Sequence, residues 1–397
     1  MAHLLIVELP GGNDVDIMRA AIERGDTFSF LTADLAHYQR QPLVSAVLEM
    51  AQRIITLPGF DYDEVQGEVL ALHKRWPIEA LLCLVDKRLL DAARLAQALG
   101  LPHIRPETAR LLRDPAALHH QLAEQGLDQA EAAPATRAAM LSHPLQQLQL
   151  QRHGQLIGCD TFSVNGRHHL LGVNEKQSFA SPYAPTASVA IRGGCFTPNQ
   201  GQYAEIERFV FARLDALGFD WGAAHTELML TEAGLRLVAV NGRLVGAKLP
   251  RLLSYALGYS VHEALVDVHL GQWPAAALAQ QDQARPMQVA VVRWLAAAHE
   301  GELRRIDLPE QATALFPGLR CVEMLKRSGD ALRPPQENAD RIGYVMVSAA
   351  TRVDAERVAE RYLAASRIVM ADEVLDPLAM AGAEPSWPSA APGRLLQ

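Results

Sequence analysis

Residues 225–246 read HTELMLTEAGLRLVAVNGRLVG. Two runs rich in apolar residues flank Glu232-Ala233-Gly234, which predicts a β-hairpin with these three residues as its turn. Pairing outward from that turn sets two pairs of residues opposite each other: Glu227 opposite Ala239, and His225 opposite Asn241. All four then share one face of the hairpin, because side chains along a strand alternate between its two faces.

The chemistry expected on this face is that of a metal and phosphate site. Directly opposed residues have Cβ atoms about 5 Å apart, so carboxylates at positions 227 and 239 would hold one or two Mg²⁺ ions against phosphates. Asn241 adds an oxygen ligand, and Arg243 offers a forked guanidinium to a phosphate or carboxylate. Position 239 is alanine, however, so half of the carboxylate pair is missing. Structural roles stay open as alternatives: Asn241 with Arg243 as a cap on the next helix, and His225 as a packed hairpin residue.

The composition bounds the class of protein. The chain has 397 residues, enough for two or three domains, and its 49% hydrophobic and 21% charged residues are ordinary for a globular protein. A net charge of −8 argues against nucleic-acid binding, which needs a basic surface. The N-terminal run MAHLLIVELPGG predicts a buried strand rather than a signal peptide, and no apolar run is long enough for a membrane span. We therefore expect a cytoplasmic protein whose four scattered cysteines stay reduced.

Residues 1–105 alternate strand-like and helix-like segments. The apolar run LLIVE is followed by a glycine loop, a helical pattern that ends at Gly25, and the strand TFSFLTADL, which together predict a βαβ unit. The pattern repeats with RIITL, a helix near 63–75, ALLCLVD and a helix from Lys87 to Leu99. An open parallel sheet with helices on both faces is therefore expected.

Two features of this predicted domain have both a functional and a structural interpretation. The Gly11-Gly12 loop can hold an anion at a helix N-terminus, but it lacks the G-x-G-x-x-G spacing, which favours a tight turn. Asp86 ends a strand of the sheet, where ligands commonly bind in open α/β folds. An aspartate at that place is as often a helix cap.

The rest of the chain is patterned less regularly. Residues 107–150 favour helices, and Asn165-Gly166 between two alternating runs predicts a two-residue hairpin. The adjacent pairs His119-His120 and His168-His169 are interpreted as solvated surface residues. His168 and His169 cannot both face one metal, because neighbours on a strand point to opposite faces. A smaller α+β region is expected near the C-terminus, with these elements: strands near 288–293 and 343–348, and a helix at 353–366.

The segment HTELMLTEAGLRLVAVNGRLVGAKLPRLLSYALGYSVHEALVDVHLG resembles the end of an ATP-grasp domain. That family's pattern is His-Thr-Glu, a strand, a glycine turn, a strand with Glu-x-Asn-x-Arg, and a helix ending in Leu-Gly. The resemblance extends to DAARLAQALGLPHIRPETARLLRD and to residues 338–366. It implies an α/β (α+β) ATP-grasp architecture with an antiparallel catalytic sheet. The implied parts are an N-terminal open parallel α/β domain (1–105), an ATP-grasp domain with a reduced central subdomain (106–272), a small C-terminal α+β lobe (273–375) and a disordered tail (376–397).

The branch that the chain most resembles joins a carboxylate to an amine through an acyl phosphate, at the expense of ATP. The resemblance implies that Glu227 and Asn241 bind Mg²⁺ and that Arg243 steadies the phosphate or the acyl phosphate. Lys176 matches a lysine often found after its strand, and Arg192 lies near a substrate-contacting position in a loosely aligned stretch. The implied cofactors are ATP and Mg²⁺, and the implied substrates are a small-molecule carboxylate and amine.

Three departures from the family pattern concern the nucleotide site. The second metal carboxylate is Ala239, and the segment that relatives write as Arg-Asp-Lys ends here in Pro115. Relatives also carry a Pro-Val-Val-x-Lys-Pro strand and a glycine-rich loop that closes over ATP, whereas this chain has no lysine between residues 88 and 175. Positioning and charge neutralisation make up most of phosphoryl-transfer catalysis, so these losses bear directly on activity.

Two hypotheses from different classes follow. The first is an ATP-grasp ligase-like protein of a small-molecule pathway, for which siderophore or other natural-product assembly is a setting typical of this branch. The second is a catalytically degenerate homologue, a pseudoenzyme that serves as a binding, scaffold or regulatory partner. An enzyme completed by a protein partner, or working as a homodimer, stays open as well. The sequence leaves undecided whether the chain is an enzyme.

Overall fold

The computed structural model describes residues 1–12, 14–127, 154–181, 184–196, 200–246, 248–282, 288–310, 312–335 and 340–371, with the backbone alone for those between 176 and 201. Two predictions fall outside the described residues. They concern most of the segment that was expected to carry the reduced central subdomain (128–153) and the tail at 376–397.

The N-terminal part is the predicted open parallel sheet. Four parallel strands lie in the order β3-β2-β1-β4: β1 (His3–Val7), β2 (Thr27–Thr32), β3 (Arg53–Thr56) and β4 (Ala80–Cys83). Along β1, Leu4 and Ile6 belong to one hydrophobic cluster while Leu5 and Val7 belong to another. Both faces of the sheet are therefore covered, as the continuous apolar runs predicted.

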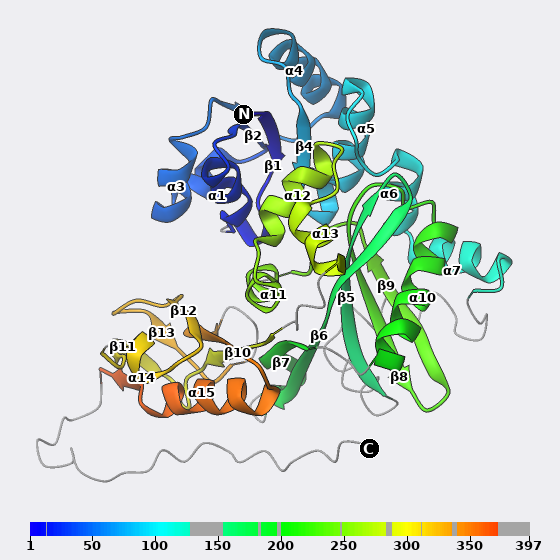
Figure 1. Ribbon diagram of the computed structural model, residues 1–397. Helices are drawn as coiled ribbons and strands as arrows, with labels where there is room; N and C mark the ends of the chain where they lie inside the picture. Colours follow the sequence, from blue (N-terminus) through cyan, green and yellow to red (C-terminus); the bar gives the residue numbers. More distant parts are fainter. Residues whose placement is uncertain are drawn as a thin grey trace, which may run out of the picture.

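Helices surround this sheet (Figure 1). Three of them match the predicted patterns: α1 (Asp16–Glu23), α4 (Tyr62–Arg75) and α5 (Leu89–Leu99), which is preceded by the 3-10 turn η2 (Asp86–Arg88). Gly100 ends α5 in the left-handed conformation, with a φ of 69°. The short helices α2 (Leu35–Gln39) and α3 (Pro42–Leu48), which join β2 to β3, were not predicted.

A long antiparallel sheet forms the second part of the fold. Its eight strands follow the order β12-β14-β10-β7-β6-β5-β8-β9. The bounds are β5 (Gln155–Val164), β6 (Arg167–Ser181), β7 (Ala184–Phe196), β8 (Gly222–Thr231), β9 (Gly234–Asn241), β10 (Val289–Leu295), β12 (Leu319–Met324) and β14 (Gly343–Ala349). The predicted two-residue hairpin between β5 and β6 is confirmed: Val164 pairs with Arg167, and Asn165 and Gly166 have φ of 52° and 71°.

Helices join the two sheets into one core. The helices α6 (Pro106–Leu112), α7 (Pro115–Glu124) and α10 (Gln200–Ala216) pack beside β5 and β8, as Figure 1 shows. The helices α11 (Leu249–Leu257), α12 (Val261–His269) and α13 (Ala275–Asp282) follow β9. Residues of α1, α11 and α12 share one hydrophobic cluster with β1 and β2, so the N-terminal sheet packs firmly on the segment after β9.

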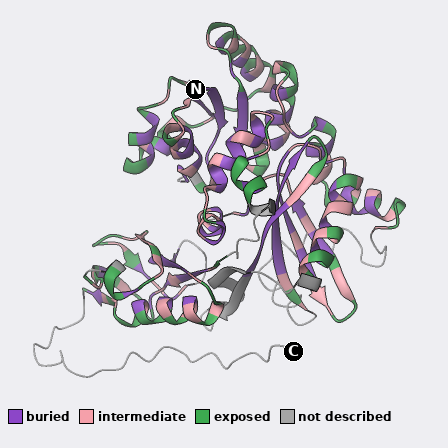
Figure 2. Cartoon of the chain, viewed as in Figure 1, coloured by how far each residue is buried: buried purple, intermediate pink, exposed green. Residues whose placement is uncertain are grey.

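The C-terminal region is built on β10 and β14. The helix α15 (Arg352–Ala364) packs against both strands, which confirms the predicted elements. A small sheet of β13 (Ala331–Leu332), β11 (Gly301–Asp307) and β15 (Arg367–Met370), with the short helix α14 (Ala312–Leu315), was not predicted. Figure 2 shows that buried residues line the strands of both large sheets, while exposed residues lie on the outer helices and turns.

Two global properties follow for the described residues. None of their helices is long and apolar enough to cross a membrane. Cys83, Cys159 and Cys321 are free thiols, in line with the expected absence of disulfides among them.

Two histidines meet where the segment between α5 and α6 contacts the end of α12. The rings of His103 and His269 lie with centroids 5.1 Å apart, and neither His103 Nε2 nor His269 Nδ1 has a hydrogen-bond partner among the described residues. Burial lowers the pKa of His103 to about 4 and that of His269 to about 3. Both rings are therefore neutral in the folded chain.

We expect this pair to make stability depend on pH. The folded state binds fewer protons than the unfolded chain below the ordinary histidine pKa near 6.5, so the free energy of unfolding falls as the pH drops from about 6.5 toward 4. Each titrating histidine contributes about 1.4 kcal/mol per pH unit. Urea unfolding at pH 7.5 and pH 5 measures the loss, and His269→Gln should remove part of it. An unchanged pH dependence in that variant would contradict the assignment.

Candidate functional site

The hairpin of β8 and β9 has the predicted register at its open end. Glu227 pairs with Ala239 and His225 pairs with Asn241, as expected. The predicted three-residue turn is wrong, because Thr231 pairs with Gly234 and the turn has two residues. A β-bulge beside Glu227 takes up the extra residue. The bulge thus sets Glu227 opposite position 239.

Glu227 lies at the boundary between core and solvent. Its side chain is 24% exposed, and its Oε1 lies 3.6 Å from Nε2 of the buried His225. The other ring nitrogen of His225 lies 3.2 Å from Oδ1 of Asp160. Burial by itself lowers the pKa of His225, but the two carboxylates raise it above its ordinary value. His225 is therefore a packed hairpin residue, which was one of the roles considered for it. It also contacts the candidate metal ligand Glu227.

Asp160, on β5, organises the polar interior of the site. It is completely buried, and it accepts hydrogen bonds from Asn174 Nδ2 at 2.9 Å and from the Val245 backbone N at 2.8 Å, besides its contact with His225. The bond to Val245 ties the loop after β9 to the sheet. Asp160 was not predicted as a site residue. Its position inside the apolar run LIGCDTF could have indicated a buried carboxylate that needs polar partners.

Gly158 leaves the space that this cluster needs. It pairs with Asn174 on one side and with Glu227 on the other. A Cβ atom at this position would lie 2.5 Å from His225 Cε1 and 2.7 Å from Asn174 Oδ1. Any larger residue therefore displaces at least one of these side chains.

Gly158→Ala is expected to destabilise the chain by about 1–3 kcal/mol, because the added methyl group overpacks a buried polar cluster. Gly67→Ala is the matched control, since Gly67 lies on the exposed side of α4 with nothing within 4 Å of an added Cβ. That variant should be stabilised by about 0.5–1 kcal/mol. Urea unfolding of both proteins measures the difference, and equal effects would refute the packing argument.

Arg243 is held by Asp86. Its Nε and Nη2 donate to Asp86 Oδ2 at 2.9 and 2.6 Å, and its Nη1 donates to the Leu244 carbonyl at 2.9 Å. The Arg243 side chain is 20% exposed and that of Asp86 is 51% exposed. Asp86 is not a helix cap, because no side chain caps η2 or α5. The helix-cap interpretation of Asn241 and Arg243 is also wrong, since α11 has no side-chain cap.

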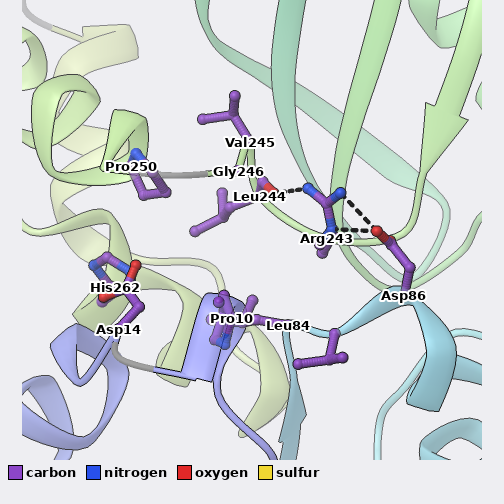
Figure 3. Close-up of a pocket in the computed structure, with 12 residues that line it drawn as sticks. Pro10, Asp14, Leu84, Asp86, Arg243, Leu244, Val245, Gly246, Pro250 and His262 are labelled. Carbon is purple, nitrogen blue, oxygen red and sulfur yellow. Dashed lines mark hydrogen bonds and ion pairs between the residues drawn. The ribbon is translucent and has the colours of Figure 1, made fainter. Parts of the chain in front are cut away.

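Two cavities lie on either side of Asp86. The first, of about 230 Å³, is lined by Pro10, Gly11, Asp14, Leu84, Val85, Asp86, Arg243, Leu244, Val245, Gly246, Pro250 and His262. Figure 3 shows the Arg243–Asp86 pair on one side of it and Asp14 and His262 on the other. The second, of about 250 Å³, is lined by Asp86, Lys87, Leu89, Leu112, Arg113, Asn241 and Gly242. Asp86 belongs to both linings, so it stands at the boundary between the two cavities.

The oxygen donors of the hairpin fit one magnesium ion at most. Glu227 supplies a carboxylate, and Asn241, whose Nδ2 donates to the His225 carbonyl at 3.4 Å, has its amide oxygen left for a ligand. No group of three or more His, Cys, Asp or Glu side chains placed to hold a metal occurs in the described part of the chain. Mg²⁺ commonly binds through one or two carboxylates together with phosphate oxygens and water. The residues therefore fit an ion that arrives with a nucleotide, and Ala239 leaves no second carboxylate for another.

Other residues singled out in the sequence lie elsewhere. Lys176 pairs with Gly193 along the backbone of β6 and β7, and Arg192 pairs with Arg293 of β10, while the side chains of Lys176 and Arg192 lie outside the described residues. The solvated-surface interpretation is wrong for His119, which is buried in α7. It is also wrong for His168, whose 3% exposed side chain contacts Ser163 and Asp215.

Comparisons with known proteins agree with this architecture. Residues 293–371 match the family described as L-amino acid ligase C-terminal domain 2. The structure resembles L-amino acid ligase from Bacillus licheniformis with a TM-score of 0.73 and 17% identity, covering 93% of this chain and 99% of that one. It resembles phosphoribosylglycinamide synthetase from Anaerococcus prevotii with a TM-score of 0.74, 14% identity and the same coverage.

Two further relatives complete the comparison. The biotin carboxylase domain of Hydrogenobacter thermophilus 2-oxoglutarate carboxylase, solved with MgADP, ADP and bicarbonate, has a TM-score of 0.60 and 14% identity over 92% of this chain and 90% of that one. A protein of Sinorhizobium fredii, described as uncharacterized protein y4rH, is 32% identical over 205 residues. That match covers 50% of this chain and 41% of the relative, so less than half of the relative's length is represented.

The fold and the site together define the class. The chain has the ATP-grasp fold: a parallel N-terminal sheet, a long antiparallel sheet that carries the candidate residues, and helices packed between them. Its residues 293–371 are of the L-amino acid ligase C-terminal type. The comparisons thus define the fold of the chain and the type of its C-terminal domain.

Proposed function

We propose that this protein uses ATP and one Mg²⁺ ion to join a small-molecule carboxylate to an amine. The single observation that carries the proposal is the open end of the β8–β9 hairpin: Glu227 and Asn241 lie on its paired strands, and Asn241 and the following Arg243 each line a cavity of small-molecule size. The C-terminal match to L-amino acid ligases supports a carboxylate–amine reaction.

The proposed reaction has two steps. An oxygen of the substrate carboxylate attacks the γ-phosphorus of ATP, which forms an acyl phosphate and releases ADP. The amine then attacks the acyl carbon, phosphate leaves, and the amine nitrogen loses a proton as the amide forms. Bound Mg²⁺ would neutralise charge on the phosphates.

The residues of this chain have distinct roles in that reaction. Glu227 and Asn241 would supply oxygen ligands for the ion, and Nε2 of His225 contacts the Glu227 carboxylate at 3.6 Å. Arg243 binds the transferred phosphoryl group or the acyl phosphate with its forked guanidinium. This requires the guanidinium to leave Asp86 or to share its donors with the ligand. Lys176 is proposed as a further catalytic residue on the family resemblance alone.

A specific observation also favours the second candidate, a degenerate homologue that acts as a binding, scaffold or regulatory partner. Arg243 already has a carboxylate partner in Asp86, and Ala239 leaves the metal with one protein carboxylate. An inactive protein would keep the Arg243–Asp86 pair as a link between β9 and the N-terminal sheet. In both candidates the chain is proposed to act in the cytoplasm, and a siderophore or other natural-product pathway is the proposed setting for the first.

A turnover assay tests the proposal. The full chain is incubated with ATP, Mg²⁺ and pools of amino acids or other carboxylates and amines, and ADP and new amides are measured. We expect ADP release that depends on both substrates, and a fall of about 10²-fold or more in Glu227→Gln, which keeps the size of the side chain but removes its charge. Equal turnover in Glu227→Gln would contradict the assigned role. No ADP release with any pool would favour the degenerate homologue.

A further inference from the structure

The second cavity lies between the residues of η2, α5 and α6 on one side and the end of β9 on the other. Lys87 comes from η2, Arg113 ends α6, and Asn241 and Gly242 come from the end of β9. These segments are far apart in the sequence, and the fold brings them around one space of about 250 Å³. The cavity is therefore a product of the tertiary structure rather than of one loop.

The charges around this cavity do not cancel. Asp86 is engaged by Arg243, so this acid and base neutralise each other. Lys87 and Arg113 are exposed, and neither side chain has a hydrogen bond or ion pair within the described part of the chain. Asp91 interacts electrostatically with Arg113 and also with Arg88 and Arg94. An excess of positive charge consequently faces the cavity.

Gly242 places Asn241, a candidate metal ligand, in the lining of the same cavity. A Cβ atom at position 242 would lie 2.7 Å from Leu89 Cδ2 and 3.2 Å from Leu112 Cδ1. Glycine at this position therefore lets the end of β9 pack directly against α5 and α6. This close approach places Asn241 in the lining together with Lys87 and Arg113.

We propose that this cavity binds a phosphate-bearing anion, with Lys87 and Arg113 as its cationic contacts and Asn241 beside them. If the proposed function holds, the anion is the polyphosphate of ATP, and this identification of the ligand rests on that function. Lys87 of the N-terminal domain and Arg113 at the end of α6 then neutralise phosphates in a chain that lacks lysine from residue 88 to residue 175. Phosphate sites in proteins commonly combine such side chains with a nearby metal ion.

The test is a calorimetric titration of the full chain with three probes: ATP with Mg²⁺, tripolyphosphate, and inorganic phosphate. The variant is the double substitution Lys87→Ala with Arg113→Ala. The control is Lys74→Ala with Arg236→Ala, which removes the same charge from exposed positions on α4 and β9. We expect at least a 10-fold loss of affinity for ATP and tripolyphosphate in the first variant and less than a 2-fold loss in the control. Circular dichroism shows whether both variants stay folded.

The outcomes separate this proposal from the proposed function. ATP affinity that is unchanged in the Lys87/Arg113 variant but lost in Glu227→Gln overturns the anion site and leaves the ligase function standing. Tripolyphosphate binding that requires Lys87 and Arg113, without ADP release in any substrate pool, supports the anion site and counts against the ligase. Binding of inorganic phosphate or tripolyphosphate but not of ATP supports the site with a free phosphate as its source. Equal losses in variant and control, or no binding of any probe, overturn the proposal.

Discussion

Replacement of Arg243 with alanine is expected to lower ATP-dependent ADP release by about 10²–10³-fold or more, without unfolding the chain. The reason is that the Arg243 guanidinium lines the first cavity and can bind two oxygens at once, and that the transferred phosphoryl group carries negative charge. The fold should tolerate the change, because the partner Asp86 is 51% exposed and can be solvated once its ion pair is lost. Exposed ion pairs contribute only about 0–1 kcal/mol.

Arg236→Ala is the matched control for this prediction. Arg236 is exposed on the same strand, β9, opposite Met229 and away from both cavities. Its removal should leave ADP release unchanged. Arg243→Lys adds a second comparison, since lysine keeps the charge but loses the fork, and it should recover only part of the activity. Full activity in Arg243→Ala would contradict the assigned role.

Asp160→Ala is expected to have the largest effect on stability, a loss of about 3–5 kcal/mol. The substitution leaves three buried donors without their acceptor: Asn174 Nδ2, His225 Nδ1 and the backbone N of Val245. Each unsatisfied buried group costs about 1–3 kcal/mol. The free energy of unfolding, measured with urea, tests the prediction.

Asp307→Ala is the control, because Asp307 forms an exposed ion pair with Arg305 on β11 and should contribute less than about 1 kcal/mol. Asp160→Asn is a milder change that keeps one acceptor oxygen and should give an intermediate loss. A loss below about 1 kcal/mol in Asp160→Ala would mean that water replaces the carboxylate, and the site would then lack the rigid core described above.

The alternation of residues predicted the β8–β9 hairpin and the pairing at its open end, but not its turn length or its bulge. The pairing of Glu227 with position 239 was predicted from an assumed three-residue turn, whereas the chain uses a two-residue turn and a bulge. The pattern of alternating residues identified the hairpin correctly. It could not distinguish these two routes, because both place the same residues opposite each other beyond the bulge.

The contacts that organise the site could not be predicted in this way. Arg243 and Asp86 are 157 residues apart, and Val245 and Asp160 are 85 residues apart. Such pairs depend on how the N-terminal sheet packs against the antiparallel sheet, which local periodicity does not encode. From the sequence, Asp86 was interpreted as a ligand residue or a helix cap, independently of the hairpin motif. Its actual partner is Arg243 of that motif.

Short elements were missed for a related reason. The helices α2 and α3 and the strands β13 and β15 are too short for hydrophobic periodicity to identify them. The strand β11 is as long as β10, but Leu303 is its only buried residue, so its sequence lacks a clear apolar face. His119 was interpreted as a solvated surface residue, yet it is buried in α7. Elements with a marked apolar face, such as α4, α5 and β10, were predicted correctly.

The site as a whole combines retained and lost features. In the proposed function Glu227, Asn241 and Arg243 serve a magnesium nucleotide, while Ala239 and Pro115 stand where the ATP-grasp pattern described above has a carboxylate and a lysine. One metal ligated by one carboxylate, with cations supplied by Lys87 and Arg113, is a physically consistent alternative arrangement. The proposed function therefore requires that the protein bind ATP in a magnesium-dependent way.

The most direct test is calorimetric titration of the purified chain with ATP, with and without Mg²⁺, beside the Glu227→Gln variant. The account predicts micromolar binding that requires Mg²⁺ and weakens at least 10-fold in the variant. Absence of binding up to millimolar ATP, or equal affinity with and without Mg²⁺ in both proteins, would contradict it.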